Sequence, residues 1–491
     1  MKNRKITNMM LGLAGTVFAA ASVQAQSTTQ APAPTPSLNQ TNAISLITNG
    51  AGTAAPGGNL WGYVFGDYAY MQHGDSAGRG TKQQYKGLGA AGQTSNPNAF
   101  EVRRAYLGYN YNINSKFSAY ALLAYEGDQD VSDNRTVYLK YIYFKWKNIF
   151  KGSDLKIGQQ ATNSFANAYN TEPLMGYRSV EKTIMDMHGV DGSSDMGLTL
   201  EGKIWHNKPA DSTKMPTFIG YSAMVGDNSG NNPVAGFTGT ATGLTNSTVT
   251  STSTSTTSGG ATTTTTTKTT VTINPFNATT DKDKKFRVNL YVNTLNNALT
   301  VGVYTDYLNY GKNLYISANG LPINGTSSHT SEAVQTMKAY AVYNSKWVGI
   351  GVEWFTQTMT NGETEVWKKG TGTNDTVNAT QNGISIFAHG TIIQNKLNIF
   401  ARYDMYTPDG AYSYNANETF TSAMTNVSSS GNGNSYKETF INAGLDWTPT
   451  ADKKIHFMPN IWSYTINNGY GSDAKKSDNY MLYRLTFLCA F

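Results

Sequence analysis

Charged residues recur along the chain in one setting: each holds an alternate position in a segment whose other positions are largely apolar or aromatic. Eight of these residues are basic and six are acidic. Side chains of this kind pair with one another or attract small ions, and the nearly even tally favours neither sign strongly. The basic residues are Arg104, Lys140, Lys156, Lys203, Arg287, Lys338, Arg402 and Arg484, and the acidic ones are Glu126, Glu201, Asp306, Glu353, Asp404 and Asp446.

Catalytic and metal-binding chemistry finds little material in this chain. A hydrolase needs a nucleophile beside a general base. His389 and His456 share the alternate positions, but no serine motif or paired acid stands out beside them. Six histidines and one cysteine, Cys489, leave little for a metal site and exclude an internal disulfide. We expect no enzyme, no metal and no cofactor, and a membrane hydrolase is the weaker alternative.

The elements that carry these residues are predicted strands. Sixteen segments alternate apolar and polar residues with the period of two that is typical of β-strands. They lie near 59–72, 100–111, 116–126, 135–147, 153–161, 195–206, 215–227, 286–294, 299–309, 333–344, 347–357, 383–393, 397–406, 437–448, 453–464 and 479–491.

Short connections alternate with long ones between these segments. Turn residues fill Asn112–Ser115, Leu295–Ala298 and Gln394–Lys396, whereas the intervening connections are far longer. Short turns at one rim, long loops at the other and an even number of strands are typical of outer-membrane barrels. We predict an all-β fold, a transmembrane antiparallel β-barrel of about 16 strands with short periplasmic turns and long extracellular loops. A soluble β-sandwich is the alternative, but its loops do not sort in this way.

The alternation also predicts which side chains face lipid. In the last segment Tyr483, Leu485 and Phe487 share one parity with the terminal Phe491, and Arg484 has the other. A lipid-facing Arg or Lys costs about 2–4 kcal/mol at mid-depth, so the charged set is expected to face the lumen. Arg103 has outward parity and is expected at the outer rim, near lipopolysaccharide or water, whereas the facing of Asp67 is left open.

The N-terminus has the pattern of an export signal. A basic start, Met1–Lys5, precedes an apolar stretch and a small-residue cleavage site at Ala25, so 1–25 is a predicted signal peptide. Residues 26–58 are a predicted flexible periplasmic segment, and 59–491 form the barrel. The formal charge of +6 includes three positive charges from the first five residues. The rest is too mild to indicate nucleic-acid binding, and we expect the bacterial outer membrane.

Two long connections have distinct compositions. The connection at about 162–196 mixes apolar and charged residues, among them Arg178, Glu181, Lys182 and Asp186. We predict that it folds into the lumen as a constriction loop and that Val180–Met187 makes a short helix against the wall; an ordinary external loop is the alternative. The connection at about 228–285 is rich in Ser and Thr and is a predicted disordered external loop.

Several motifs in order resemble one family. Phe100–Gly108 includes a Phe-x-x-Arg-Arg-Ala segment, and Ile157–Gln160 is followed by Asn163–Phe165 and Arg178–Glu181. Over about 100–206 this order is similar to the phosphate-selective porin O and P family. The resemblance implies a sixteen-stranded barrel, usually a homotrimer, whose third loop constricts each pore, with Arg104 and Arg178 as pore residues.

The resemblance also implies anion channels lined by arginine, and this chain departs from that pattern. Only eight arginines follow the predicted signal peptide, and the inward acids nearly match the bases. We therefore expect passive diffusion of small hydrophilic solutes or inorganic anions, with a weak anion preference and contacts to lipid and lipopolysaccharide. Expected pore-lining residues are Arg104, Lys140, Lys203, Arg287, Arg402 and Arg484. Surface adhesion through the long external loops is the alternative function.

Overall fold

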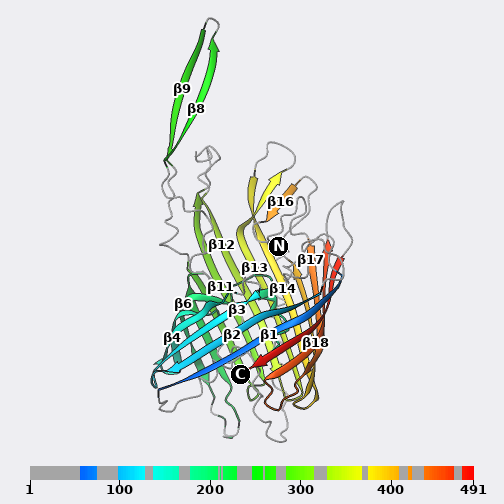
Figure 1. Ribbon diagram of the computed structural model, residues 1–491. Helices are drawn as coiled ribbons and strands as arrows, with labels where there is room; N and C mark the ends of the chain where they lie inside the picture. Colours follow the sequence, from blue (N-terminus) through cyan, green and yellow to red (C-terminus); the bar gives the residue numbers. More distant parts are fainter. Residues whose placement is uncertain are drawn as a thin grey trace, which may run out of the picture. The chain divides into compact units, whose positions relative to one another are not determined.

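The structure is a computed structural model, and its main feature is a barrel of long antiparallel strands (Figure 1). It describes residues 56–73, 98–127, 136–164, 177–207, 209, 211, 214–228, 246–257, 260–271, 284–314, 329–367, 374–407, 418–422, 436–468 and 478–491. The predicted signal peptide and nearly all of the predicted flexible segment lie outside these residues. No helix among the described residues is long and apolar enough to cross a bilayer.

The sixteen predicted strands are confirmed. Each neighbour in the chain pairs antiparallel with the next, and the first strand pairs with the last, which closes the barrel. The strands are β1 (Gly57–His73), β2 (Asn98–Asn112), β3 (Phe117–Glu126), β4 (Tyr138–Phe150), β5 (Ser153–Ala161), β6 (Ser194–His206), β7 (Phe218–Gly226), β10 (Lys285–Thr294), β11 (Leu299–Leu314), β12 (His329–Asn344), β13 (Val348–Trp367), β14 (Asn374–Ile393), β15 (Leu397–Thr407), β17 (Tyr436–Trp447), β18 (Ile455–Asn468) and β19 (Asp478–Ala490).

The predicted alternation between lipid and lumen is visible along β10. Phe286 and Leu290 are 57% and 41% exposed on the outer face, whereas Arg287 and Asn289 are 1% and 3% exposed on the inner face. A closed barrel leaves no unpaired strand edge in the membrane, so every ladder hydrogen bond is satisfied internally. This closed barrel with an apolar exterior belongs to the bacterial outer membrane.

The barrel closes at its C-terminal residue. Phe491 and Gly62 exchange two backbone hydrogen bonds, of 2.9 and 3.2 Å. A Cβ atom at Gly62 would lie 2.3 Å from the Phe491 ring, and one at Gly66 would lie 2.9 Å from the Phe487 ring. The absence of side chains at Gly62 and Gly66 of β1 therefore gives the rings of Phe487 and Phe491 their space.

The short turns contain the expected left-handed residues. Asn296 and Asn297 between β10 and β11 have φ values of 57° and 66°, and Asn395 between β14 and β15 has a φ of 63°. Asn tolerates this region better than most residues, because its short side chain bonds locally. The turn prediction is thus confirmed at these positions.

Three further strands lie outside the barrel wall. The short β16 (Glu418–Ser422) pairs with the end of β13. β8 (Asn246–Thr257) and β9 (Gly260–Val271) form a two-stranded sheet of their own within the Ser/Thr-rich connection. The Ser/Thr-rich composition of 228–285 predicts disorder, whereas its residues 246–257 and 260–271 form strands, because β-branched Thr also favours strand pairing.

Candidate functional site

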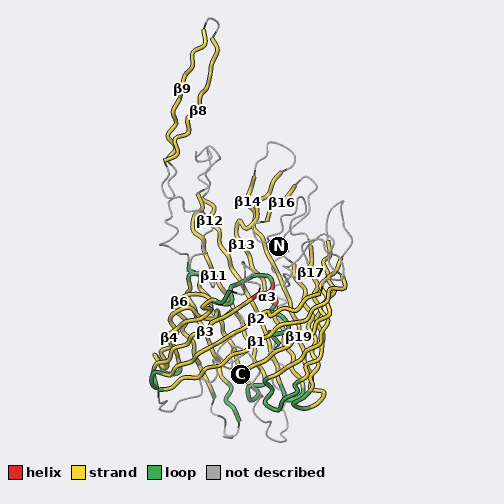
Figure 2. The backbone as a smooth tube through the Cα atoms, viewed as in Figure 1, coloured by secondary structure: helices red, strands yellow, loops and turns green. Residues whose placement is uncertain are grey.

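The connection between β5 and β6 runs inside the barrel. Its described parts are residues 162–164 and 177–193, called here the inner loop. It contains one helical turn, α3 (Ile184–Met187), whose N-cap Thr183 accepts a 3.3 Å hydrogen bond from the Asp186 amide. Figure 2 shows α3 among the barrel strands, and Ile184 and Met185 on it are fully buried with Phe355 and Tyr406 of the wall. The sequence predicted such a helix within Val180–Met187.

Side chains of the wall hold the inner loop by its backbone carbonyls. Arg484 of β19 donates to the Val180 carbonyl at 3.0 Å, and Lys338 of β12 donates to the Ser164 carbonyl at 2.8 Å. A charged donor makes a hydrogen bond about twice as strong as a neutral one. Further donors on the wall are Arg103 to Ser179, Arg402 to Lys182, Gln357 to Val190 and Asn289 to Asn163.

Acidic side chains of the inner loop make the converse contacts. Asp191 accepts from Arg287 at 2.9 and 3.0 Å and from Lys285 at 2.9 Å, and Arg287 also donates to Asp195 at 2.8 Å. Burial raises the pKa of the Asp191 carboxyl, but these two cations outweigh it and hold the pKa well below its ordinary value. Arg287 is therefore an ion-pair partner of the loop.

The opposite end of the inner loop packs against β14–β19. Tyr177 donates from its hydroxyl to Asp446 at 3.2 Å, and its ring lies 5.3 and 4.9 Å from the rings of Phe387 and Phe400. Glu181 accepts a 3.0 Å hydrogen bond from the Trp462 indole and lies 3.6 Å from the Arg484 guanidinium. The loop thus contacts strands on both sides of the barrel, β10–β12 and β14–β19.

A locally basic group surrounds Arg178 on the inner loop. Arg178 pairs with Asp186, and both side chains keep partial exposure, 13% and 14%. Burial raises the pKa of Asp186, but Arg178, and after it Lys182, Arg104 and Lys140, reverse this and lower the pKa below its ordinary value. Lys182 is half-buried, and its backbone amide donates to the Glu181 carboxylate at 2.9 Å.

His188 ends α3 beside two groups that act on it in opposite ways. Its ring stacks on Tyr406 at 3.5 Å, and Nε2 lies 3.5 Å from the Glu438 carboxylate. The carboxylate favours a charged imidazole, but burial and, after it, the Arg402 guanidinium lower the pKa of His188 to about 3. His188 is therefore neutral at physiological pH.

The basic residues predicted to line the pore mostly contact acidic or aromatic side chains of the barrel wall. Glu126 lies 2.5 Å from the Lys140 ammonium and 3.5 Å from the Arg104 guanidinium. Lys203 is half-buried, and its ammonium lies 4.3 Å from the centre of the Phe218 ring. Arg402 pairs with Asp404 of its own strand at 2.5 Å. The predicted inward facing of this set agrees with its burial.

Two bulges place further charges in the lumen that parity arguments missed. Phe65 pairs with Arg104 and Gly66 with Val102, so Arg103 is an extra residue in β2. The prediction that Arg103 faces outward is therefore wrong: it is 8% exposed and pairs with Asp67. An extra residue reverses the parity of one flank of the strand.

A second bulge of the same kind lies in β4. Leu122 pairs with Tyr141 and Leu123 with Leu139, so Lys140 is the extra residue. Lys145 consequently turns inward, and its ammonium lies 2.9 Å from Asp154 and 3.2 Å from Glu201. Lys156 pairs with the other oxygen of Glu201 at 2.7 Å. Strict alternation from Lys140 places Lys145 on the lipid side, and only the bulge at Lys140 reveals its inward position.

The charges of the lumen are nearly balanced. Among the described residues, ten basic and eleven acidic side chains are buried. The basic ones are Arg103, Arg104, Lys140, Lys145, Lys156, Lys285, Arg287, Lys338, Arg402 and Arg484; the acidic ones are Asp67, Glu126, Glu181, Asp191, Asp195, Glu201, Asp306, Glu353, Asp404, Glu438 and Asp446. Within the described ranges, no group of three His, Cys, Asp or Glu residues has the geometry to hold a metal ion.

Solved structures of other outer-membrane proteins have a similar fold. No family model and no curated protein matches the chain. Among solved structures, the outer membrane channel DcaP of Acinetobacter baumannii is 12% identical with a TM-score of 0.50, over 89% of this chain and 98% of its own. An anion-selective porin from Comamonas acidovorans is 10% identical with a TM-score of 0.47, over 89% of this chain and 100% of its own. OmpT of Vibrio cholerae in its trimer form is 10% identical with a TM-score of 0.43, over 89% and 100%. At these identities the likeness concerns the fold.

Proposed function

We propose that this protein is a porin, which lets small hydrophilic solutes diffuse passively through its lumen, and that the inner loop sets the narrowest point. The observation that carries the proposal is the set of wall donors that hold the loop backbone inside the barrel. Arg103, Arg402 and Arg484 reach it from β2, β15 and β19. A loop held at many points narrows a lumen reproducibly, and a fixed constriction is what gives a pore its size limit.

The charge of the constriction supports a weak anion preference. Arg178 pairs with Asp186 and keeps partial exposure, Lys182 lies nearby, and Arg104 and Lys140 share the single carboxylate of Glu126. A local positive surplus raises the concentration of anions in a narrow lumen. The remaining lumenal bases are largely paired with carboxylates, which reduces their pull on a passing anion.

Phosphate specificity does not follow from this arrangement. A phosphate site needs several cationic donors that are free to converge on one anion. Arg287 and Arg402 instead bind Asp191 and Asp404, and Arg484 binds Glu181 and the Val180 carbonyl. We propose a porin related in architecture to the phosphate-selective family, without its arginine-lined pathway.

The proposed assembly is a homotrimer embedded in outer-membrane lipid and lipopolysaccharide. Chemical cross-linking of the protein in outer-membrane vesicles tests it, because a trimer gives a ladder that ends at three copies. A single band at the mass of one copy contradicts the trimer and leaves the porin proposal standing.

Recording in planar bilayers tests the porin function itself. We expect stepwise conductance and, in a salt gradient, a reversal potential that shows a modest preference for chloride over potassium. Arg178→Ala is expected to lower that preference, whereas Lys116→Ala, which removes the same charge at a periplasmic turn, leaves it unchanged. Purified, inserted protein without conductance steps overturns the porin proposal, and equal reversal potentials for Arg178→Ala and the wild type overturn the role of Arg178.

A further inference from the structure

Three aromatic rings follow one another along the lumenal face of β1. The centres of Trp61 and Tyr63 lie 6.1 Å apart with planes at 24°, and those of Tyr63 and Phe65 lie 6.0 Å apart with planes at 10°. Alternate residues of a strand share one face, so these rings form a row along the wall. We call Trp61, Tyr63 and Phe65 the aromatic row.

Neighbouring strands widen this row into a surface. The Tyr106 ring of β2 lies 4.9 Å from Tyr63, and the Tyr120 ring of β3 lies 6.3 Å from Trp61. The Tyr143 ring of β4 continues it at 5.0 Å from Tyr120. These three rings are 3%, 3% and 6% exposed, so they support the aromatic row from the neighbouring strands.

The aromatic row connects the constriction with the periplasmic mouth. β1 starts at Gly57, which pairs with Asn112 beside the short β2–β3 turn. From there the row runs up to Phe65, whose ring lies 5.2 Å from the Arg103 guanidinium. Arg103 in turn holds the inner loop at Ser179. A solute that passes the constriction therefore meets the row next.

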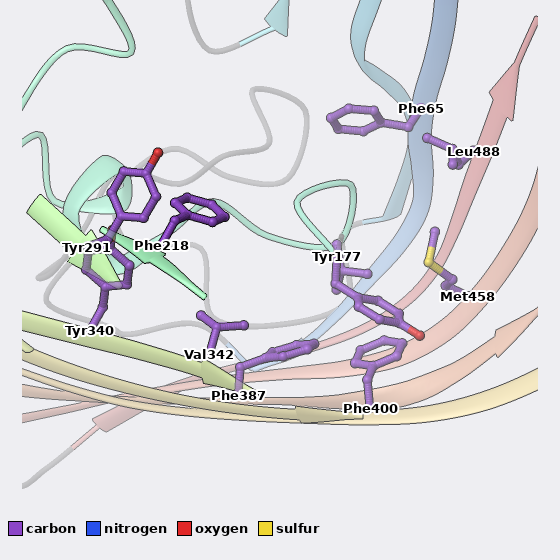
Figure 3. Packing of buried hydrophobic residues seen from close by; sticks show 11 residues of the cluster. Phe65, Tyr177, Phe218, Tyr291, Tyr340, Val342, Phe387, Phe400, Met458 and Leu488 are labelled. Carbon is purple, nitrogen blue, oxygen red and sulfur yellow. The ribbon is translucent and has the colours of Figure 1, made fainter. Parts of the chain in front are cut away.

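Aromatic side chains also project from the walls elsewhere in this part of the lumen (Figure 3). Figure 3 shows Tyr177 of the inner loop against Phe387 and Phe400, with Phe218 and Tyr291 together at another part of the wall. These rings are almost fully buried against one another. Trp61 and Tyr63 differ from these rings and from Phe65, which is 3% exposed, because both are only partly buried.

Neutral hydrogen-bonding groups border the aromatic row. Asn110 pairs with Tyr120 across β2 and β3, so the two side chains share the lumenal face. Asn110 is 7% exposed, and its Oδ1 atom, like Nε1 of Trp61, has no hydrogen-bond partner among the described residues. Buried polar atoms normally have partners, so a solute hydroxyl that reached either atom would gain a hydrogen bond that the described residues leave unmade. The charges beside the row are paired: Arg103 near Phe65 binds Asp67, and Glu126 lies 2.5 Å from Lys140 and 3.5 Å from Arg104.

We propose that the aromatic row is a binding path for neutral sugars, and that such sugars are a preferred class of solute for the channel. This inference rests on the proposed porin function. One face of a pyranose ring carries mainly C–H groups, which pack on aromatic rings, and its edge carries hydroxyls, which bind amide and indole groups. Inorganic anions gain nothing from such a surface, because an aromatic face cannot replace their water and repels negative charge. Apolar lining with a few placed polar groups is the common pattern of small-molecule sites.

Swelling of proteoliposomes compares two solutes that differ in this feature. Glucose is a pyranose in water, whereas sorbitol has the same number of carbon atoms and no ring. We expect wild-type channels to pass glucose several-fold faster than sorbitol. Trp61→Ala and Tyr63→Ala should bring the ratio of the two rates close to one, and Trp61→Phe should keep most of it. Tyr109→Ala removes an aromatic ring from the outer face of β2 and should leave the ratio as in the wild type.

Calorimetry with maltose on the detergent-purified protein measures binding without transport. A change of 1.4 kcal/mol corresponds to tenfold in affinity, and we expect Trp61→Ala to weaken binding by about this factor. Equal rates for glucose and sorbitol in conducting wild-type channels, or maltose binding that is unchanged in Trp61→Ala and Tyr63→Ala, overturn the sugar path while the porin function stands. Maltose binding by a protein that shows no conductance overturns the porin function instead.

Discussion

Arg484→Ala should open the constriction, because Arg484 anchors the inner loop. Its guanidinium donates to the Val180 carbonyl at 3.0 Å and to Asn460 at 2.9 Å, and it lies 3.6 Å from the Glu181 carboxylate. The side chain is only 3% exposed, so water cannot take over these contacts. In Arg484→Ala, Glu181 keeps the Trp462 indole as a partner but loses its buried cation.

The size of the effect follows from the cost of a broken buried pair. Removing one partner of such a pair costs about 3–5 kcal/mol, because the other charge loses a buried counter-charge. Each 1.4 kcal/mol is a factor of ten, so the population with the loop segment around Val180 detached rises by about a hundredfold to a few thousandfold. If the docked state is favoured by a similar free energy, the detached state becomes common enough to be seen in single channels.

Single-channel recording distinguishes an anchor from a selectivity residue. For an anchor, Arg484→Ala gives larger and noisier conductance steps, and Arg484→Ala combined with Glu181→Gln restores part of the wild-type behaviour, because no buried charge is stranded. For a selectivity residue, the reversal potential shifts at unchanged conductance and the second substitution rescues nothing. Conductance and noise equal to the wild type in Arg484→Ala would refute the reasoning.

Three further expectations follow from other contacts. Burial lowers the pKa of His188 from 6.5 to about 3 in the docked loop, which therefore holds the neutral form. The docked loop loses stability as the pH falls from about 6.5 towards 3, because the detached loop binds the proton first. Channel noise should rise over this pH window, and His188→Phe should remove the pH dependence. Asp191→Asn removes the carboxylate through which the inner loop pairs with Lys285 and Arg287, which keep Asp306 and Asp195 as partners, and faster proteolysis of the inner loop than in the wild type should report the weaker docking. Gly62→Val places a side chain where the Phe491 ring lies, so the heat-resistant folded band in SDS gels should weaken, whereas Gly390→Ala, whose nearest neighbour is at 3.6 Å, should leave that band intact.

The barrel could be predicted from the sequence because its determinants are local. A strand of the wall needs only one apolar side facing lipid and one polar side facing the lumen, and both repeat every second residue. β10 shows this pattern along its whole length, from Lys285 to Thr294. Turn residues such as Asn296 and Asn395 add the register, since their backbone conformation suits a tight hairpin.

The roles of the lumenal residues could not be predicted in the same way. The alternation predicts that Arg402 and Arg484 face inward. It does not predict that Arg402 binds the Lys182 carbonyl or that Arg484 lies beside the Glu181 carboxylate, because these partners are more than two hundred positions away in the chain. The bulges at Arg103 and Lys140 interrupt parity without a sequence signal that the alternation rule recognises. Contacts between distant segments depend on the closed barrel, which periodicity alone does not describe.

A count of inward charges is therefore a poor guide to what a barrel of this type transports. A buried cation in the lumen must be compensated, and the inner loop supplies carbonyls and carboxylates for that purpose. Arg287 forms an ion pair with Asp191, and Arg402 forms one with Asp404. Both arginines therefore stabilise the constriction without offering free charge to a solute. Among the described residues, Arg178, Lys182 and the side chains of Trp61 and Tyr63 keep partial exposure. Selectivity in this channel should accordingly follow these accessible groups, and substitutions at the fully paired charges should change how wide the pore is before they change what it prefers.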